Sequence, residues 1–165
     1  MKLVELGYEP ERWDEDVARA RARGRGVAVG RVAADFGVEH RVVGSFGEER
    51  ATLTGKLRFG GTSRPAVGDF VLLTGSPGSR TLTAVLPRKS SLTRQAAGKK
   101  VAAQLIAANL DVVFVVTSFN EDFNFNRLER YLTAVWESGA APFVLLNKMD
   151  LAEDPDARVA EVEPI

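Results

Sequence analysis

The amino-acid sequence predicts a mixed fold, in which a five-stranded antiparallel β-barrel is followed by the opening βαβ part of an α/β domain. Short runs rich in valine, leucine, threonine and phenylalanine recur between residues 27 and 87, with turn-forming residues between them. A continuous apolar run then covers residues 111–118, and an amphipathic pattern leads from it to a second apolar run at 142–147. The change in the spacing of hydrophobic residues predicts the boundary between the barrel and the βαβ unit.

Composition excludes several classes of protein. The chain has 165 residues, of which 45% are hydrophobic, enough for a packed core in one domain or two small ones. It has no cysteine, which excludes disulfides, thiolate metal sites and cysteine nucleophiles. The single histidine, His40, begins a strand and is expected at the surface. No apolar stretch approaches ~18 residues and the N-terminus has no signal-peptide core, so we expect a cytoplasmic protein without membrane contact.

The first 26 residues are predicted to be an N-terminal helical extension. Its helix runs from about Glu11 to Arg23, with acids in the first turn and arginines in the last, as the helix dipole favours. Trp13 lies on the apolar stripe of this helix and is expected to anchor it in a core.

The barrel is predicted to span residues 27–88. Its five strands correspond to the runs 27–36, 40–46, 50–59, 68–75 and 80–88, without helices between them. A barrel of the OB type fits this count. Phe46, Phe59 and Phe70 lie on these strands, where core packing is favoured over a role as base-stacking platforms.

Charge is distributed unevenly along a chain whose net charge is zero. Residues 1–49 carry 8 basic and 10 acidic side chains, residues 50–100 carry 10 basic and 1 acidic, and residues 101–165 carry 4 basic and 11 acidic. The net charges of these segments are therefore −2, +9 and −7. Such a basic middle segment favours a polyanionic partner, although ordinary variation in the charge of a small β domain stays possible.

Residues 89–102 are predicted to be a basic linker between the two parts. No acid lies between Arg88 and Leu110. An electrostatic groove for an RNA backbone is one interpretation, and a solvated linker is the other. The candidate RNA-binding side chains are Arg88, Lys89, Arg94, Lys99 and Lys100.

Residues 103–165 are predicted to begin an α/β domain. The run 111–118 has the pattern of a strand buried on both faces, and 142–147 is its parallel partner. Between them, apolar residues at helical spacing predict an amphipathic helix with one buried stripe, formed by Leu128, Tyr131, Leu132, Val135 and Trp136. One crossover cannot bury both faces of its strands. The sheet is therefore expected to be unfinished, with an edge through which the chain can self-associate.

Asn147, Lys148 and Asp150 follow the second strand directly. In open α/β sheets ligands bind just outside the carboxyl ends of the strands. A carboxylate there can accept two parallel hydrogen bonds from the N1–H and 2-amino groups of guanine, which adenine does not offer. The asparagine amide can bond the base edge or a neighbouring loop, and the lysine stem can cover the ring. The alternative is a helix-capping Asp150 beside a solvated Lys148.

These residues resemble those of a known family. The stretches "PRKSSLTRQAAG" (87–98) and "QLIAANLDVVFVVTSFNEDFNFNRLERYLTAVWESGAAPFVLLNKMDL" (104–151) closely resemble the ribosome small-subunit-dependent GTPase A (RsgA) family. The pattern P-x-V-G-D-x-V from Pro65 to Val71 resembles the OB domain of that family. The resemblance implies that the α/β part opens a P-loop-type GTPase domain.

The resemblance also implies a circularly permuted GTPase, in which the guanine-recognition motif precedes the phosphate-binding loop. By resemblance, Asn147, Lys148 and Asp150 bind guanine, and the barrel and basic linker face ribosomal RNA. The full-length protein is expected to use GTP with Mg²⁺ in late maturation of the small ribosomal subunit. A structural zinc is expected in a cysteine-rich C-terminal domain of the family.

The chain departs from that family where phosphate chemistry is concerned. It has no G-x-x-x-x-G-K-[ST], because "TGKL" (54–57) and "GKKV" (98–101) lack both the spacing and the hydroxyl residue. The loop, the metal-binding residues and the zinc domain are expected downstream of Ile165. We therefore expect no catalytic or metal-binding residue in this chain, no GTP hydrolysis by it alone, and no bound cofactor. The other hypothesis is an RNA-binding OB-type module without nucleotide chemistry.

Overall fold

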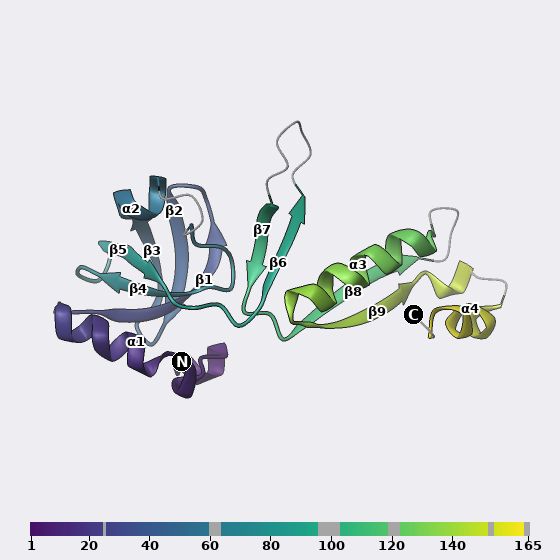
Figure 1. Cartoon of the computed structure of the whole chain (residues 1–165), viewed down its shortest axis with the longest axis horizontal. Coiled ribbons are helices and arrows are strands. Elements are labelled where there is room, and N and C mark those ends of the chain that lie inside the picture. The colour runs from purple at the N-terminus through teal and green to yellow at the C-terminus, as the bar shows by residue number, and fades with distance from the viewer. Residues whose placement is uncertain (25, 60–63, 96–102, 119–122, 152–153, 164–165) are drawn as a thin grey trace. The chain divides into compact units, whose positions relative to one another are not determined.

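The computed structural model describes residues 1–24, 26–59, 64–95, 103–118, 123–151 and 154–163 (Figure 1). The chain forms two compact units. The barrel unit comprises Met1–Lys89 and Leu105–Asn109, and the βαβ unit comprises Ser90–Gln104 and Leu110–Ile165.

The barrel unit contains the predicted five-stranded barrel. Its strands close in the order β1-β2-β3-β5-β4, where the bounds are β1 (Ala28–Asp35), β2 (Glu39–Gly44), β3 (Gly47–Leu53), β4 (Phe70–Thr74) and β5 (Arg80–Val85). Four pairings are antiparallel, as predicted, and β3 pairs with β5 in parallel. A parallel neighbour needs a crossover, which here includes α2 (Gly55–Phe59) and β4.

Helix α2 replaces the second half of a predicted strand. The run 50–59 leaves the sheet after β3, because the Thr54 carbonyl accepts hydrogen bonds from two amides of α2. Leu57 is buried, whereas Phe59 is 82% exposed, so the expectation that Phe59 belongs to the core is wrong. Phe70 is fully buried as expected, and Phe46 is partly buried against the barrel core.

The predicted N-terminal extension packs against the barrel. Helix α1 (Pro10–Arg23) follows the short 3-10 helix η1 (Leu3–Leu6) and inserts Trp13, which is fully buried as expected. The indole Nε1 donates a hydrogen bond to the Pro87 carbonyl at 2.7 Å. Trp13 shares one core cluster with residues of the barrel, namely Val29, Phe70, Leu72 and Leu86. Helix and barrel are therefore one unit.

The expected surface position of His40 is wrong, because its side chain is fully buried. Strand β2 alternates, and His40, Val42 and Gly44 all face inward. The imidazole Nε2 lies 3.2 Å from Asp35 Oδ1, although neither ring nitrogen makes a hydrogen bond of good geometry. Burial lowers the pKa of His40, and the nearby Arg64 acts in the same direction against the attraction of Asp35.

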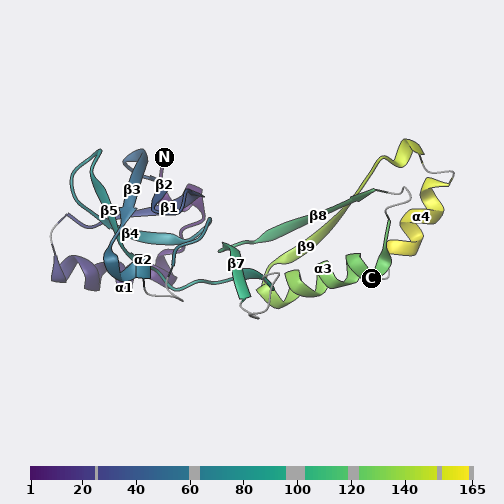
Figure 2. The ribbon, with the colours of Figure 1, turned by 90° about the horizontal axis from the view of Figure 1, so that it is seen from above.

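The βαβ unit has the predicted strand, helix and parallel strand. Strand β8 (Val112–Ser118) pairs in parallel with β9 (Ala141–Asn147), and α3 (Phe125–Ser138) lies along the pair (Figure 2). The short helix η3 (Met149–Leu151) and helix α4 (Pro155–Val162) follow. The core consists of Val115, Leu128, Leu132, Val135, Ala140 and Val162.

Only one face of this two-stranded sheet is covered within the described residues. The other face leaves five large apolar side chains 40–63% exposed, so burial on both faces is not observed; they are Val112, Phe114, Val116, Phe143 and Leu145. The buried stripe of α3 is also narrower than predicted. Tyr131 and Trp136 lie at its margins and are 53% and 63% exposed, which makes the expectation of Trp136 as a core anchor wrong.

Part of the predicted linker is a strand. Ser91–Gln95 form β6, which pairs with β7 (Ala103–Ala108) in a two-stranded sheet. The boundary between the two units runs through this segment. Lys99 and Lys100 lie outside the described residues.

Candidate guanine site and basic segment

The three candidate guanine-binding residues lie at the carboxyl end of β9. Asn147 is the last residue of the strand, and its partner in the sheet is Ser118, the last residue of β8. The carboxyl ends of both parallel strands therefore lie side by side and form one edge of the sheet, where ligands of open α/β sheets bind. Asn147, Lys148 and Asp150 are all exposed at this edge.

A left-handed residue shapes the turn after β9. Lys148 has φ of 58°, and its amide donates a hydrogen bond to the Asn147 side-chain Oδ1 at 2.9 Å. This bond engages the single side-chain oxygen of Asn147, and its amide NH₂ makes no hydrogen bond within the described residues. The chain then enters η3, in which Met149 packs against the core of the unit. The turn is thus anchored by an apolar side chain between exposed polar ones.

Asp150 does not serve as the helix cap. The cap of α4 is Asp154, whose Oδ1 accepts a hydrogen bond from the Ala157 amide at 3.1 Å. Within the described part of the chain, the exposed carboxylate of Asp150 makes no hydrogen bond or ion pair. Both of its oxygens are therefore available to accept hydrogen bonds from a ligand.

Arg88 forms an ion pair inside the barrel unit. Its Nε and Nη2 donate to the two carboxylate oxygens of Asp69, each at 2.7 Å. Asp69 is fully buried and also accepts a hydrogen bond from the Ala66 amide at 2.8 Å. The hydrogen-bonded carboxylate raises the pKa of Arg88 above its ordinary value. The single acid of the basic segment thus offsets the charge of Arg88.

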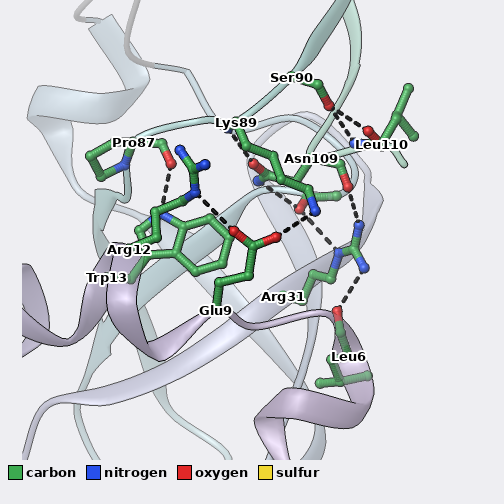
Figure 3. A network of polar contacts seen from close by, with 11 residues as sticks. Leu6, Glu9, Arg12, Trp13, Arg31, Pro87, Lys89, Ser90, Asn109 and Leu110 are labelled. Atoms are coloured by element: carbon green, nitrogen blue, oxygen red, sulfur yellow. Dashed lines mark hydrogen bonds and ion pairs between the residues drawn. The ribbon is translucent and has the colours of Figure 1, made fainter. Parts of the chain in front are cut away.

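Lys89 is bound in a similar way, by Glu9 at the N-cap position of α1 (Figure 3). Its Nζ lies 2.7 Å from Glu9 Oε1, and Arg12 donates to the other oxygen of Glu9 at 3.0 Å. These hydrogen bonds, that of Lys89 first, lower the pKa of Glu9. Arg88 and Lys89 therefore stabilise the end of the barrel, and any contact they make with RNA competes with these pairs.

Asn109 joins distant parts of the barrel unit, a structural role that its place before an apolar run does not indicate. Asn109 is buried in a left-handed conformation with φ of 53°. Its side chain accepts from the Lys89 amide at 2.9 Å and donates to the Gly68 carbonyl at 3.1 Å, while its carbonyl accepts from Arg31 at 2.8 Å (Figure 3). These partners are far apart in the chain, so no local pattern indicates the contact.

Gly68 is the position in this network where a side chain cannot fit. Its φ is +92°, and a Cβ there would lie 2.0 Å from the Ala108 carbonyl oxygen. The V-G-D pattern therefore has a physical explanation, because the glycine permits a close backbone contact and Asp69 binds Arg88.

The other basic candidates differ from this pair. Arg94 is exposed and donates from Nε and Nη2 to Gln104 Oε1 at 3.2 and 3.1 Å. No three His, Asp or Glu side chains of the described residues converge as metal ligands. None of the described helices is long and apolar enough to cross a membrane.

Comparison with known proteins identifies relatives of the chain. The model of the family described as RsgA GTPase matches residues 85–164. A "Small ribosomal subunit biogenesis GTPase RsgA" from Methanosarcina acetivorans is 42% identical over 156 residues, which are 93% of this chain and 42% of that protein. The protein of the same name from Syntrophotalea carbinolica is 41% identical over 154 residues, covering 87% of this chain and 42% of the relative.

A solved structure has the same fold. The crystal structure of YjeQ from Thermotoga maritima matches with a TM-score of 0.64 and 26% identity, over 84% of this chain and 48% of that one. The chain spans about two fifths of the length of the curated relatives it matches. The relatives match over the barrel and the βαβ unit alike, and the family model matches over residues 85–164, so the chain belongs to the RsgA GTPase family.

Proposed function

We propose that this chain supplies the guanine-recognition edge of a GTPase that acts in biogenesis of the small ribosomal subunit. The observation that carries the proposal is the exposed Asp150 carboxylate, which is unpaired within the described residues, on an anchored turn at the end of β9. Its two oxygens match the N1–H and 2-amino donors of guanine, whereas adenine has an acceptor at N1 and no 2-amino group. The names and sequences of the relatives support the same function.

Asn147 and Lys148 complete the recognition edge. With Oδ1 bound to the Lys148 amide, the NH₂ of Asn147 is free to donate to an acceptor on the base edge or on a neighbouring loop. The Lys148 stem extends from an exposed left-handed residue and covers one face of the base. Each of the three residues thus has a separate role in holding one purine.

Hydrolysis belongs to the full-length protein. Phosphoryl chemistry needs a cradle of backbone amides and a hydroxyl ligand for Mg²⁺, and these 165 residues contain no G-x-x-x-x-G-K-[ST]. We infer that this chain alone binds the base and turns over no GTP, while the whole protein uses GTP and Mg²⁺ and carries a structural zinc. A phosphate-release assay on the purified chain checks the inference, and turnover above a protein-free blank would contradict it.

The second part of the proposal is that the protein contacts ribosomal RNA and acts in the cytoplasm. It is supported by the net charge of +9 over residues 50–100, whose only acid, Asp69, is buried and paired with Arg88. Arg94 is an exposed candidate for this contact, and Lys99 and Lys100 stay candidates from the sequence. RNA binding is expected to weaken steeply as salt concentration rises, whereas guanine binding is not. RNA binding without any guanine preference would instead favour a pure RNA-binding module.

Base recognition is tested by titrating the ¹⁵N-labelled chain with GMP and with AMP. We expect GMP to shift the amide resonances of residues 147–150 and AMP to leave them unchanged at the same millimolar concentrations. Asp150→Ala should abolish the GMP shifts. Asp156→Ala, which removes an exposed carboxylate from the first turn of α4, is the matched control and should leave them intact. Equal shifts with both nucleotides would refute the proposal.

A further inference from the structure

Helix α2 presents an aromatic ring to solvent. Phe59 is 82% exposed, the largest exposure of any large hydrophobic side chain among the described residues. The Arg58 guanidinium lies over this ring, 5.5 Å from its centroid. One face of the ring is thus covered by a cation. An exposed ring of this kind is a surface on which a nucleic-acid base can stack.

The barrel fixes the orientation of this helix. Leu57 is only 4% exposed and belongs to the barrel core, which sets the rotation of α2. Lys56 and Phe59 are three residues apart, so they lie on neighbouring positions of the outer side. Lys56 is exposed and has no ion-pair partner within the described ranges. It also lines a groove of about 410 Å³ together with Leu57 and the segment from Thr83 to Arg88.

The charge around α2 favours a polyanionic ligand over a neutral one. No acid occurs between Arg50 and Asp69, and Lys56, Arg58 and Arg64 are all exposed. Phe36 is another exposed ring of the barrel unit with an arginine over it, but its surroundings are less basic. The arginine is Arg50, whose guanidinium lies 3.2 Å from Glu39 Oε2. A carboxylate therefore accompanies that ring and would repel phosphate.

We propose that α2 and the groove beside it bind single-stranded RNA. One base stacks on the free face of Phe59, and the phosphates on either side contact Lys56 and Arg58. The inference rests on the ribosomal RNA contact proposed above and names Phe59 as the residue that contacts a base. OB-type barrels usually bind oligonucleotides on the face of their second and third strands, so α2 is a separate site.

The inference is tested by fluorescence anisotropy with a labelled, uridine-rich single strand of about 12 nucleotides, within the range that OB folds bind. Phe59→Ala should weaken binding about fivefold or more, the loss expected for one stacked base. Phe59→Trp should keep the affinity, and its added indole emission should be quenched by RNA. Lys56→Gln should lower the slope of log affinity against log salt by about 0.7, the value for one phosphate of a single strand.

The control is Phe114→Ala, which removes a 62% exposed ring from the βαβ unit and should leave RNA affinity unchanged. Melting curves verify that each variant is folded, which is expected because neither ring is buried.

If the parent chain binds RNA and Phe59→Ala binds equally well, the α2 site is wrong while the RNA proposal stands. If the parent chain binds no RNA at low salt, both fail, and the GMP titration remains an independent result. If Phe59→Ala weakens binding to small ribosomal subunits but not to RNA, the ring contacts protein and the inference is overturned.

Discussion

The two units of this chain bury apolar residues in different ways. The barrel closes on itself, and Val42, Phe70 and Leu82 have no exposed surface. The β8–β9 sheet is covered by α3 on one side, and Phe114 and Phe143 on the other side are 62% and 55% exposed. A closed barrel has no edge, whereas a two-stranded sheet with one helix has two. The barrel unit therefore depends on satisfied internal contacts, and the βαβ unit carries its candidate guanine-binding side chains at the carboxyl end of β9.

The largest expected effect is the loss of a buried partner in the barrel unit. Asp69→Ala leaves the buried Ala66 amide and the partly buried Arg88 guanidinium, whose side chain is 24% exposed, without their acceptor. Removing one member of a fully buried pair costs about 3–5 kcal/mol, and we expect a loss at the lower end of this range because water reaches Arg88. Chemical denaturation followed by Trp13 emission, in a Trp136→Phe background, measures the loss.

The matched control for Asp69→Ala is Glu48→Ala. Glu48 lies 3.7 Å from Arg41 in an exposed ion pair of the same barrel, where removal should cost about 0–1 kcal/mol. Equal losses in the two variants would show that the barrel does not depend on its buried pair.

The next effect concerns the open face of the βαβ unit. We propose that this face and the sheet edges beside it lead the isolated chain to self-associate at high concentration. Phe114→Lys with Phe143→Lys should reduce association several-fold in sedimentation velocity, because two charges would enter the apolar contact. The free energy of unfolding should change little, since both rings are already exposed. A parent chain that stays monomeric at every concentration would contradict this prediction.

The smallest effect is a dependence of barrel stability on pH. The pKa of buried His40 is lowered below its ordinary value of 6.5, so the unfolded chain binds this proton more readily than the folded one. The stabilising contribution is complete above about pH 6.5 and is lost as pH falls from there toward the lowered pKa. Denaturation midpoints from pH 8 to pH 5 measure it. His40→Gln should flatten the slope, and an unchanged slope would assign the dependence to other groups.

The sequence predicted the barrel and the βαβ unit because hydrophobic period is a local signal. It missed α2 because residues 50–59 have strand-like composition, while the helix depends on hydrogen bonds to the Thr54 carbonyl and on Leu57 entering the core. It placed His40 at the surface by residue type, although the alternation of His40 with Val42 indicates the inner face of β2. At this position the residue type predicted an exposed side chain and the strand alternation predicted a buried one, and the alternation was right.

The candidate site was predictable in part. The spacing of Asn147, Lys148 and Asp150 after an apolar strand located the edge, but the left-handed backbone of Lys148 appears only in the fold. The network around Asn109 was not predictable, because Arg31 reaches it across 78 positions of the chain. Contacts of that range are set by tertiary packing and leave no periodic pattern.

The most direct test of guanine recognition is a change of base preference by Asp150→Asn. The asparagine keeps one acceptor for N1–H and replaces the other with a donor, which suits the 2-oxo group of xanthine and not the 2-amino group of guanine. Dissociation constants for GMP and XMP are measured on the parent chain and the variant by the amide shifts of residues 147–150. We predict that the parent prefers GMP and that the variant prefers XMP. A variant that keeps the preference for GMP would contradict the assignment of Asp150 to the base.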